Sequence, residues 1–173
     1  MEISRFDPCE EALVFRKKFG SFEDAWNECK RGDWMLWIAS RLNVDLKTLT
    51  KAKALCALTV KHLMKDKRSL YACKIALKFS KGRATIDDLH AAAAAAADAD
   101  ADAAAYAAYA AADAADAAAA AAAYAAADAD ADAAAAAYAA YADAKKENRE
   151  KTSDICREIL TFQVFKKIKT LNN

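Results

Sequence analysis

One low-complexity segment constrains the fold of this chain more than any other feature. Residues 91–144 contain only Ala, Asp and Tyr, as 40 Ala, 9 Asp and 5 Tyr. Alanine has the highest helix propensity of all residues, so the segment is predicted to be helical. A single helix of this length would span about 80 Å, twice the ~40 Å diameter of a compact domain of this size. We therefore expect two or three helices that fold back on each other, with breaks near the Asp-Ala-Asp-Ala-Asp stretches at 98–102 and 128–132.

The rest of the chain is rich in helix start and stop signals and shows no alternating strand pattern. The residues expected to begin helices are Asp7, Ser21, Asp33, Asp45 and Thr85, and those expected to end them are Gly20, Gly32 and Gly82. The prediction is an all-α, single-domain, multi-helical bundle over residues 1–173, with closely packed Ala-rich helices. Its parts are short capped helices at 1–90, the Ala/Asp/Tyr helices at 91–144, and an amphipathic helix at 145–173. That last helix is expected to pack on the N-terminal body through Ile155, Ile159, Phe162, Phe165 and Ile168.

Composition argues against most catalytic and cofactor-binding classes. Three glycines cannot form a glycine-rich phosphate loop, and His62 and His90 lie in no zinc signature. The Asp triplets lack the glycine and the distal glutamate of a calcium loop. We therefore expect no enzyme activity, no metal and no cofactor.

The five cysteines and the hydropathy pattern indicate a compartment. The cysteines contain no C-x-x-C pair and fall in helical stretches, so they are predicted to be reduced core residues, as in a cytoplasmic protein. The N-terminus has no apolar signal segment, and no uncharged run reaches the ~18–20 residues of a membrane helix. A cytoplasmic protein without a membrane partner is the expectation.

Charge divides the chain into an acidic segment and a basic remainder. Residues 91–144 carry nine Asp and no cation, although the whole chain has a formal net charge of +1. On a helical wheel most of the non-Ala residues share an arc about 100° wide. As a binding surface for a partner this arc would comprise Asp102, Tyr106, Tyr109, Asp113, Asp116, Tyr124, Tyr138 and Tyr141. The alternative is that the Asp and Tyr residues only keep an Ala helix hydrated.

Several blocks outside the Ala-rich segment resemble a known family. The runs Cys9-Glu-Glu-Ala-Leu13, Gly20–Trp37, Cys56–Ser69 and Thr152–Arg157 are similar to immunity proteins of bacterial polymorphic toxin systems. The most specific block is Arg31-Gly-Asp-Trp-Met-Leu-Trp37. The resemblance implies a small helical antidote, without catalytic activity, that binds a cognate protein toxin and neutralises it by occlusion.

The block at residues 31–37 is expected to build the fold rather than a site. Gly32 is predicted to end one helix, Asp33 to cap the next, and Trp34 and Trp37 to face inward.

A second hypothesis is a helical scaffold or a nucleic-acid-associated protein that uses the basic N-terminal body. Lysines and arginines crowd residues 47–68, and three lysines lie at 166–169. The simpler interpretation is that these charges hydrate the helices and offset the acidic segment, so nucleic acid is not the partner we expect.

Overall fold

The computed structural model describes residues 3–64, 66–97 and 131–172, and for residues 97, 131–141 and 172 it describes the backbone alone. The helices are α1 (Glu10–Lys17), α2 (Phe22–Glu28), α3 (Gly32–Arg41), α4 (Leu46–Leu58), α5 (Lys67–Ser80), α6 (Ile86–Ala97) and α8 (Ala131–Asn172), with 3-10 turns at Ser4–Phe6 and Lys61–Leu63. The described ranges contain no strand, which confirms the all-α prediction.

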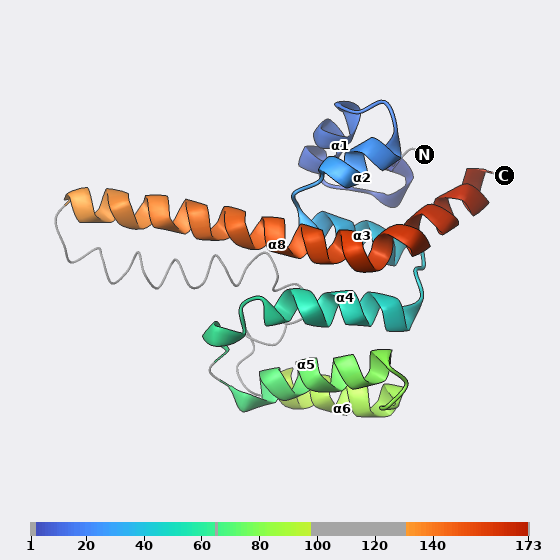
Figure 1. Cartoon of the computed structure of the whole chain (residues 1–173), viewed down its shortest axis with the longest axis vertical. Coiled ribbons are helices and arrows are strands. Elements are labelled where there is room, and N and C mark those ends of the chain that lie inside the picture. The colour runs from blue at the N-terminus through green and yellow to red at the C-terminus, as the bar shows by residue number, and fades with distance from the viewer. Residues whose placement is uncertain (1–2, 65, 98–130, 173) are drawn as a thin grey trace.

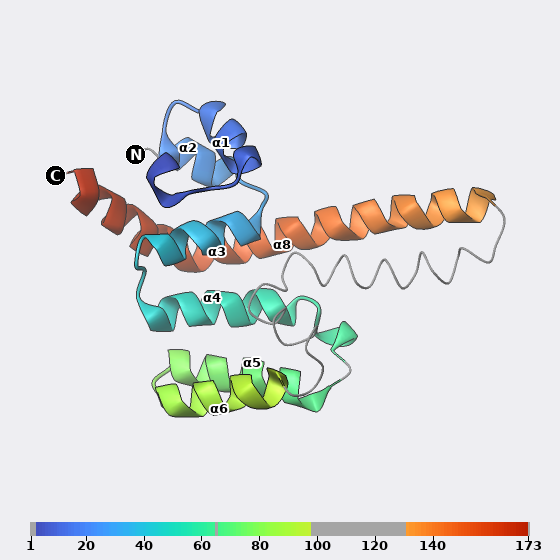
Figure 2. The ribbon, with the colours of Figure 1, turned by 180° about the vertical axis from the view of Figure 1, so that it is seen from behind.

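The helices form a stack around α8 (Figure 1). α3 lies beside α8, and the pair is covered on one side by α1 and α2 and on the other by α4 (Figure 2). α5 packs on α4, and α6 packs on α5. The core of the stack lies where α2, α3 and α4 meet α8. Its fully buried side chains include Met35, Cys56, Leu160 and Val164.

The two predicted N-caps at Ser21 and Asp45 are confirmed. The Ser21 hydroxyl accepts the backbone N–H of Asp24 at 2.9 Å, and the Asp45 carboxylate accepts that of Thr48 at 2.9 Å. Each cap satisfies an N–H that has no partner within its helix, and such a cap contributes about 1 kcal/mol. The hydrogen bonds from Thr48 hold the pKa of Asp45 below its usual value.

The turn between α5 and α6 also follows the sequence prediction. Gly82 has φ +69°, and the backbone N–H of Arg83 donates to the carbonyl of Lys78 at 2.8 Å, so a glycine in the left-handed region ends α5. The Asp88 N–H donates to the Thr85 hydroxyl at 3.1 Å, and the Thr85 N–H donates to the Asp88 carboxylate at 2.8 Å. This reciprocal capping box begins α6.

The predicted boundaries of the first helix are wrong. Asp7 has φ 55° and ends the preceding 3-10 turn, so it cannot also begin a helix, and the N-cap of α1 is Cys9 in extended geometry. The helix ends at Lys17, and Gly20 lies in the following loop without a positive φ. Asp tolerates the left-handed region, so the chain turns at Asp7 and α1 begins two residues later than expected.

Close packing of alanines is visible at the start of the Ala-rich segment. Ala92 and Ala96 of α6 are buried, one helical turn apart, while the alanines between them are exposed. α6 packs on α5. Small side chains at buried positions allow helix axes to approach closely.

α8 is continuous across residue 144, where the sequence predicted the boundary between the Ala-rich helices and the C-terminal helix. Its 42 residues correspond to about 63 Å, and its N-terminal part extends past the ends of α3 and α4 (Figure 1). The buried row is Cys156, Leu160, Val164 and Ile168, with a spacing of four residues. Phe162, which we expected in the apolar stripe, is 76% exposed because its position points away from this row.

Candidate functional site: the junction around residues 31–37

Gly32 is the point at which α3 crosses α8. It is the first residue of α3, so it does not end α2, which stops at Glu28 with Cys29 in extended geometry. A Cβ atom at Gly32 would lie 2.5 Å from Oγ1 of Thr152 and 2.8 Å from its backbone carbonyl carbon. Glycine is therefore required for close approach between the two helices, and not for a left-handed turn as predicted.

Asp33 holds Arg31 rather than capping the helix. The N-cap of α3 is Arg31, and it makes no side-chain capping bond. Nε and Nη2 of Arg31 both donate to the Asp33 carboxylate, the Nε bond at 2.9 Å. This pairing is the largest of the effects that raise the pKa of the Arg31 guanidinium. The guanidinium also lies 4.5 Å from the ring centroid of Trp34 and 3.8 Å from the Glu11 carboxylate, so it links α1 to the start of α3.

Trp34 and Trp37 are half-buried at the edge of the core, so the inward orientation predicted for them holds only in part. The Trp34 ring is 5.8 Å from that of Phe15 of α1, and the Trp37 ring lies beneath the Arg41 guanidinium at 5.8 Å. The deeply buried positions of α3 are instead Met35, Leu36, Ile38 and Ala39. Met35 and Ile38 also line the pocket beside the N-terminal helices, and Trp34 contacts Phe15 of α1.

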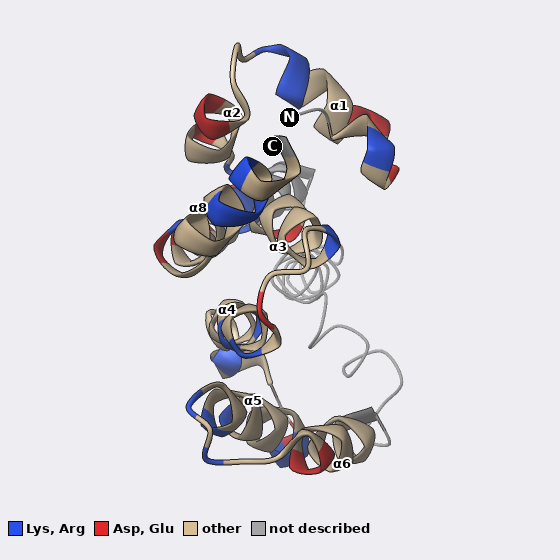
Figure 3. Ribbon diagram, turned by 90° about the vertical axis from the view of Figure 1, so that its right-hand side faces the viewer, with Lys and Arg blue, Asp and Glu red and all other residues tan. Residues whose placement is uncertain are grey.

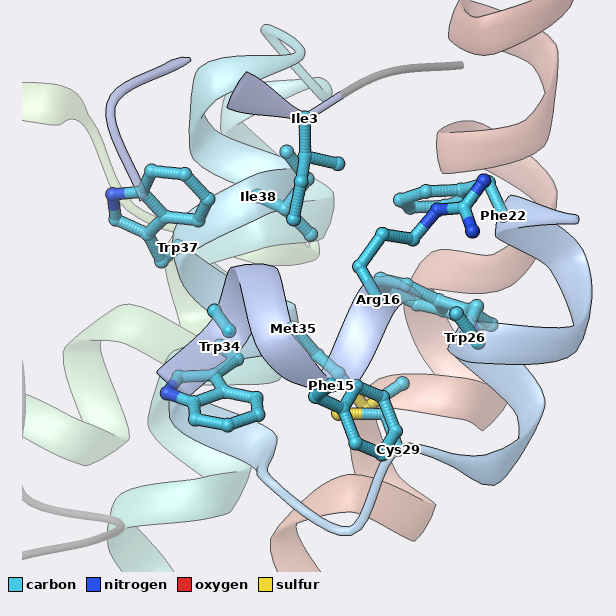
Figure 4. Close-up of a pocket in the computed structure, with 12 residues that line it drawn as sticks. Ile3, Phe15, Arg16, Phe22, Trp26, Cys29, Trp34, Met35, Trp37 and Ile38 are labelled. Atoms are coloured by element: carbon cyan, nitrogen blue, oxygen red, sulfur yellow. The ribbon is translucent and has the colours of Figure 1, made fainter. Parts of the chain in front are cut away.

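A small apolar pocket lies between these tryptophans and the N-terminal helices (Figure 4). Its lining includes Phe15, Trp26, Trp34 and Met35, and its charged side chain is Arg16, whose Nη1 donates to the Phe19 carbonyl at 2.8 Å. The cavity volume of about 50 Å³ is a third of the ~150 Å³ that accommodates one benzene molecule. The pocket is therefore too small for a substrate or an organic cofactor.

Buried thiols lie at the centre of the junction. Cys56 of α4 and Cys156 of α8 have their sulfur atoms 3.9 Å apart, and both are fully buried. The Cys156 thiol donates to the Gly32 carbonyl at 3.6 Å, and the Cys56 thiol donates to the Thr152 carbonyl at 3.7 Å. Four residues from the sequence blocks that carry the family resemblance thus contact one another.

Four of the five cysteines are buried as predicted, but Cys9 is exposed because it occupies the N-cap of α1. The Cys56 thiol and burial both raise the pKa of Cys156, and burial raises the pKa of Cys29 and Cys73. A protonated, buried thiol is a poor nucleophile. The buried cysteines therefore have a packing role.

We expect one thiol of the native protein, that of Cys9, to react rapidly with an aromatic disulfide reagent at mildly alkaline pH, and all five to react in denaturant. The measurement is the absorbance of the released thiolate. In the Cys9→Ser variant the rapid phase should disappear. Rapid reaction of two or more thiols in the folded wild type would contradict the burial of the junction.

Arg157 of α8 fastens the end of α2 to the junction. Its Nη1 donates to the backbone carbonyls of Cys29 at 2.7 Å and Asn27 at 3.2 Å, which satisfies acceptors left free where α2 ends. Its Nη2 donates to the Ser153 hydroxyl at 2.9 Å. The planar guanidinium therefore donates hydrogen bonds to the end of α2 and to a side chain of α8 at the same time. The sequence analysis named Thr152 and Arg157 only as the ends of a block that carries the family resemblance and assigned neither a structural role, because their partners Gly32 and Cys29 lie more than 100 residues away.

The predicted Asp/Tyr surface falls largely outside the described residues. Those lying wholly outside are Asp102, Tyr106, Tyr109, Asp113, Asp116 and Tyr124. Tyr138 and Tyr141 belong to α8, of which the backbone alone is described there.

Searches of the described ranges for metal-binding and membrane-spanning features gave no candidates. In residues 3–64, 66–97 and 131–172 no three His, Cys, Asp or Glu side chains are placed to hold a metal ion. His62 and His90, which lie in no zinc signature, are both exposed. No described helix is both long and apolar enough to cross a membrane.

The junction therefore has a structural role. Gly32, the thiols of Cys56 and Cys156, and the Arg157 guanidinium lie where α2, α3, α4 and α8 meet. Comparison of the chain with family models, with curated proteins and with solved structures found no match.

Proposed function

We propose that this chain is a non-catalytic antidote that binds a bacterial protein toxin and neutralises it by occlusion. The observation that supports this is the contact between the blocks that carry the resemblance. Gly32, Cys56, Thr152 and Cys156 come from three of these blocks and meet at one junction. Segments that are far apart in the sequence but meet in the core are expected when the members of a family share a fold. A shared fold still allows the surface of each member to fit a different partner.

The contact surface we propose is the Asp/Tyr arc of the Ala-rich helices. Tyrosine supplies large contact area at low entropic cost, and nine carboxylates without a cation would steer a toxin with a basic cleft toward the antidote. One further observation favours this location. The N-terminal part of α8, which carries Tyr138 and Tyr141, extends past the described helices that pack on α8 (Figure 1).

A growth assay tests this proposal. A candidate toxin domain that arrests growth, taken from a gene neighbouring the one that encodes this chain, is expressed with the wild-type chain, which is expected to restore growth. Tyr138→Ala/Tyr141→Ala should weaken toxin binding by about 30- to 1,000-fold, which corresponds to roughly 2–4 kcal/mol, and protection should fail at equal expression.

The matched control is Tyr71→Ala, which also removes an exposed tyrosine but from α5. It should protect as the wild type does. Full protection by the double variant, with an unchanged melting temperature, would remove the arc as the contact surface. Failure of the wild-type chain to protect would contradict the antidote proposal itself.

A further inference from the structure

The hairpin formed by α4 and α5 is strongly basic. Residues 46–83 contain eleven Lys or Arg and a single acidic residue, Asp66. Asp66 is already engaged, because Arg68 donates to both of its carboxylate oxygens. A net charge of about +10 within one helical pair creates a positive potential that attracts polyanions.

Four residues of α5 and its C-cap, Lys81, gather on one exposed face. Lys67, Tyr71, Lys74, Lys78 and Lys81 are separated by four, three, four and three residues, so they share an arc of about 80°. The other faces of α5 pack on α4 and α6. Figure 3 shows blue Lys and Arg segments in the ribbons of α4 and α5 and in the loop that follows α5, beside the red segment of α6. We call the row from Lys67 to Lys81 the basic face of α5.

The lysines of the basic face, which are Lys67, Lys74, Lys78 and Lys81, have no carboxylate partner in an ion pair among the described residues. Asp88 lies on the neighbouring helix α6. Hydrogen bonds from Thr85 are the main cause of its lowered pKa, and Lys78 lowers this pKa by a smaller amount.

Lys47 extends the basic face across to α4. Its Nζ would lie 3.8 Å from a Cβ atom placed at Gly82, which follows directly after Lys81. Lys51, also exposed, is one helical turn further along α4. The cations of two helices therefore meet at one end of the hairpin.

We propose that the basic face of α5 binds single-stranded nucleic acid through its phosphate backbone, without sequence specificity. The row from Lys67 to Lys81 is about 21 Å long, which is long enough to contact several successive phosphates of one strand. Tyr71 is 55% exposed between Lys67 and Lys74, so its ring is placed for a base to stack on while the lysines hold phosphates.

Other polyanionic partners fit the face less well. It contains no Arg, Asn or Gln for reading base edges in a duplex groove. A helix that lies on a membrane needs a large apolar face beside its cations, and Tyr71 is the sole aromatic or aliphatic side chain in the row. The proposal goes beyond the antidote function and does not rest on it.

Fluorescence anisotropy of the full chain with a labelled oligothymidylate of roughly 16 nucleotides tests the proposal. We expect saturable binding that weakens steeply between about 50 and 200 mM salt. The variant Lys74→Gln/Lys78→Gln/Lys81→Gln should bind at least tenfold more weakly, and the slope of log K against log salt should fall by about 2. A matched control, Lys17→Gln/Lys18→Gln/Lys169→Gln, removes three exposed lysines elsewhere and should change binding less than threefold.

Tyr71 distinguishes nucleic acid from other anions. Tyr71→Ala should weaken oligothymidylate binding at least fivefold, and Tyr71→Phe should retain it, because stacking needs only the ring. Melting temperatures of all variants should match that of the wild type, since every substituted side chain is exposed.

Three outcomes would overturn the proposal. The first is equal loss of binding in the two lysine variants, which would make the effect one of net charge. The second is an unchanged affinity in Tyr71→Ala together with equal binding of polyglutamate, which would point to an acidic protein. The third is binding to phosphatidylserine vesicles without binding to oligothymidylate.

Discussion

Replacing Gly32 with Ala is expected to lower the free energy of unfolding by about 2–3 kcal/mol and the melting temperature by roughly 5–10 °C. Helix propensity alone predicts the opposite sign, since Ala is favoured over Gly by up to ~1 kcal/mol. The clash prevails because the new Cβ atom would meet the side chain of Thr152 at 2.5 Å and its backbone at 2.8 Å. Backbone atoms of α8 cannot rotate away, so α3 must separate from α8. Thermal and urea unfolding followed by circular dichroism provide the measurement.

Gly20→Ala is the matched control, because no atom lies within 4 Å of a Cβ placed there. It should change stability by less than ~0.5 kcal/mol. Adding Thr152→Ala to Gly32→Ala should recover part of the loss, but not all, since the backbone contact persists. Equal melting temperatures for Gly32→Ala and Gly20→Ala would show that α3 and α8 do not approach as closely as described.

Replacing Trp26 with Ala is expected to be the most damaging single truncation, at about 3–5 kcal/mol. Trp26 is 3% exposed and packs against Phe22 and Phe165, with ring centroids 6.2 and 6.3 Å away. Its indole N–H donates to the Thr161 hydroxyl at 2.9 Å. The substitution removes both the largest apolar contact of α2 and its hydrogen bond to α8. Urea unfolding should report a lower midpoint.

Trp26→Phe should cost less, about 1–2 kcal/mol, because it keeps one aromatic ring in the core and removes only the N–H donor and part of the ring volume. Phe162→Ala is the control for aromatic truncation on α8, since that side chain is 76% exposed. It should stay within ~0.5 kcal/mol of the wild type. A Trp26→Ala variant as stable as Phe162→Ala would contradict the packing of α2 on α8.

The sequence predicted the helical class and several helix ends because those features are local. Ser21, Asp45 and the Thr85–Asp88 pair satisfy N–H groups within three residues, and Gly82 adopts a positive φ in its own turn. Such signals do not depend on what packs elsewhere.

The predictions that failed required knowledge of distant contacts. Gly32 resembles a helix stop in sequence, yet its role is set by Thr152, which is 120 residues away in the chain. Asp33 resembles an N-cap, yet its carboxylate is held by Arg31. No one-dimensional pattern marks these pairings, so the tertiary contacts decided them.

The candidate binding surfaces could be predicted only in outline. The lysines of residues 47–68 were visible as a cluster, but the basic face of α5 also depends on which sides of that helix α4 and α6 cover. Lys67, Tyr71, Lys74, Lys78 and Lys81 share a face by helical geometry, and their exposure follows from packing. The arc of Asp and Tyr residues stays a prediction from periodicity.

The central claim, that this chain neutralises a toxin by binding rather than by catalysis, is tested most directly by stoichiometry. The purified toxin domain is assayed for its own activity while the wild-type chain is added in increasing molar ratio, at concentrations well above the dissociation constant. Occlusion predicts a linear fall in toxin activity that reaches its minimum at a fixed, stoichiometric ratio and is reversed when the complex is separated in denaturant. Progressive loss of activity at far lower ratios would indicate a catalytic antidote, and unchanged activity at excess would contradict the proposed function.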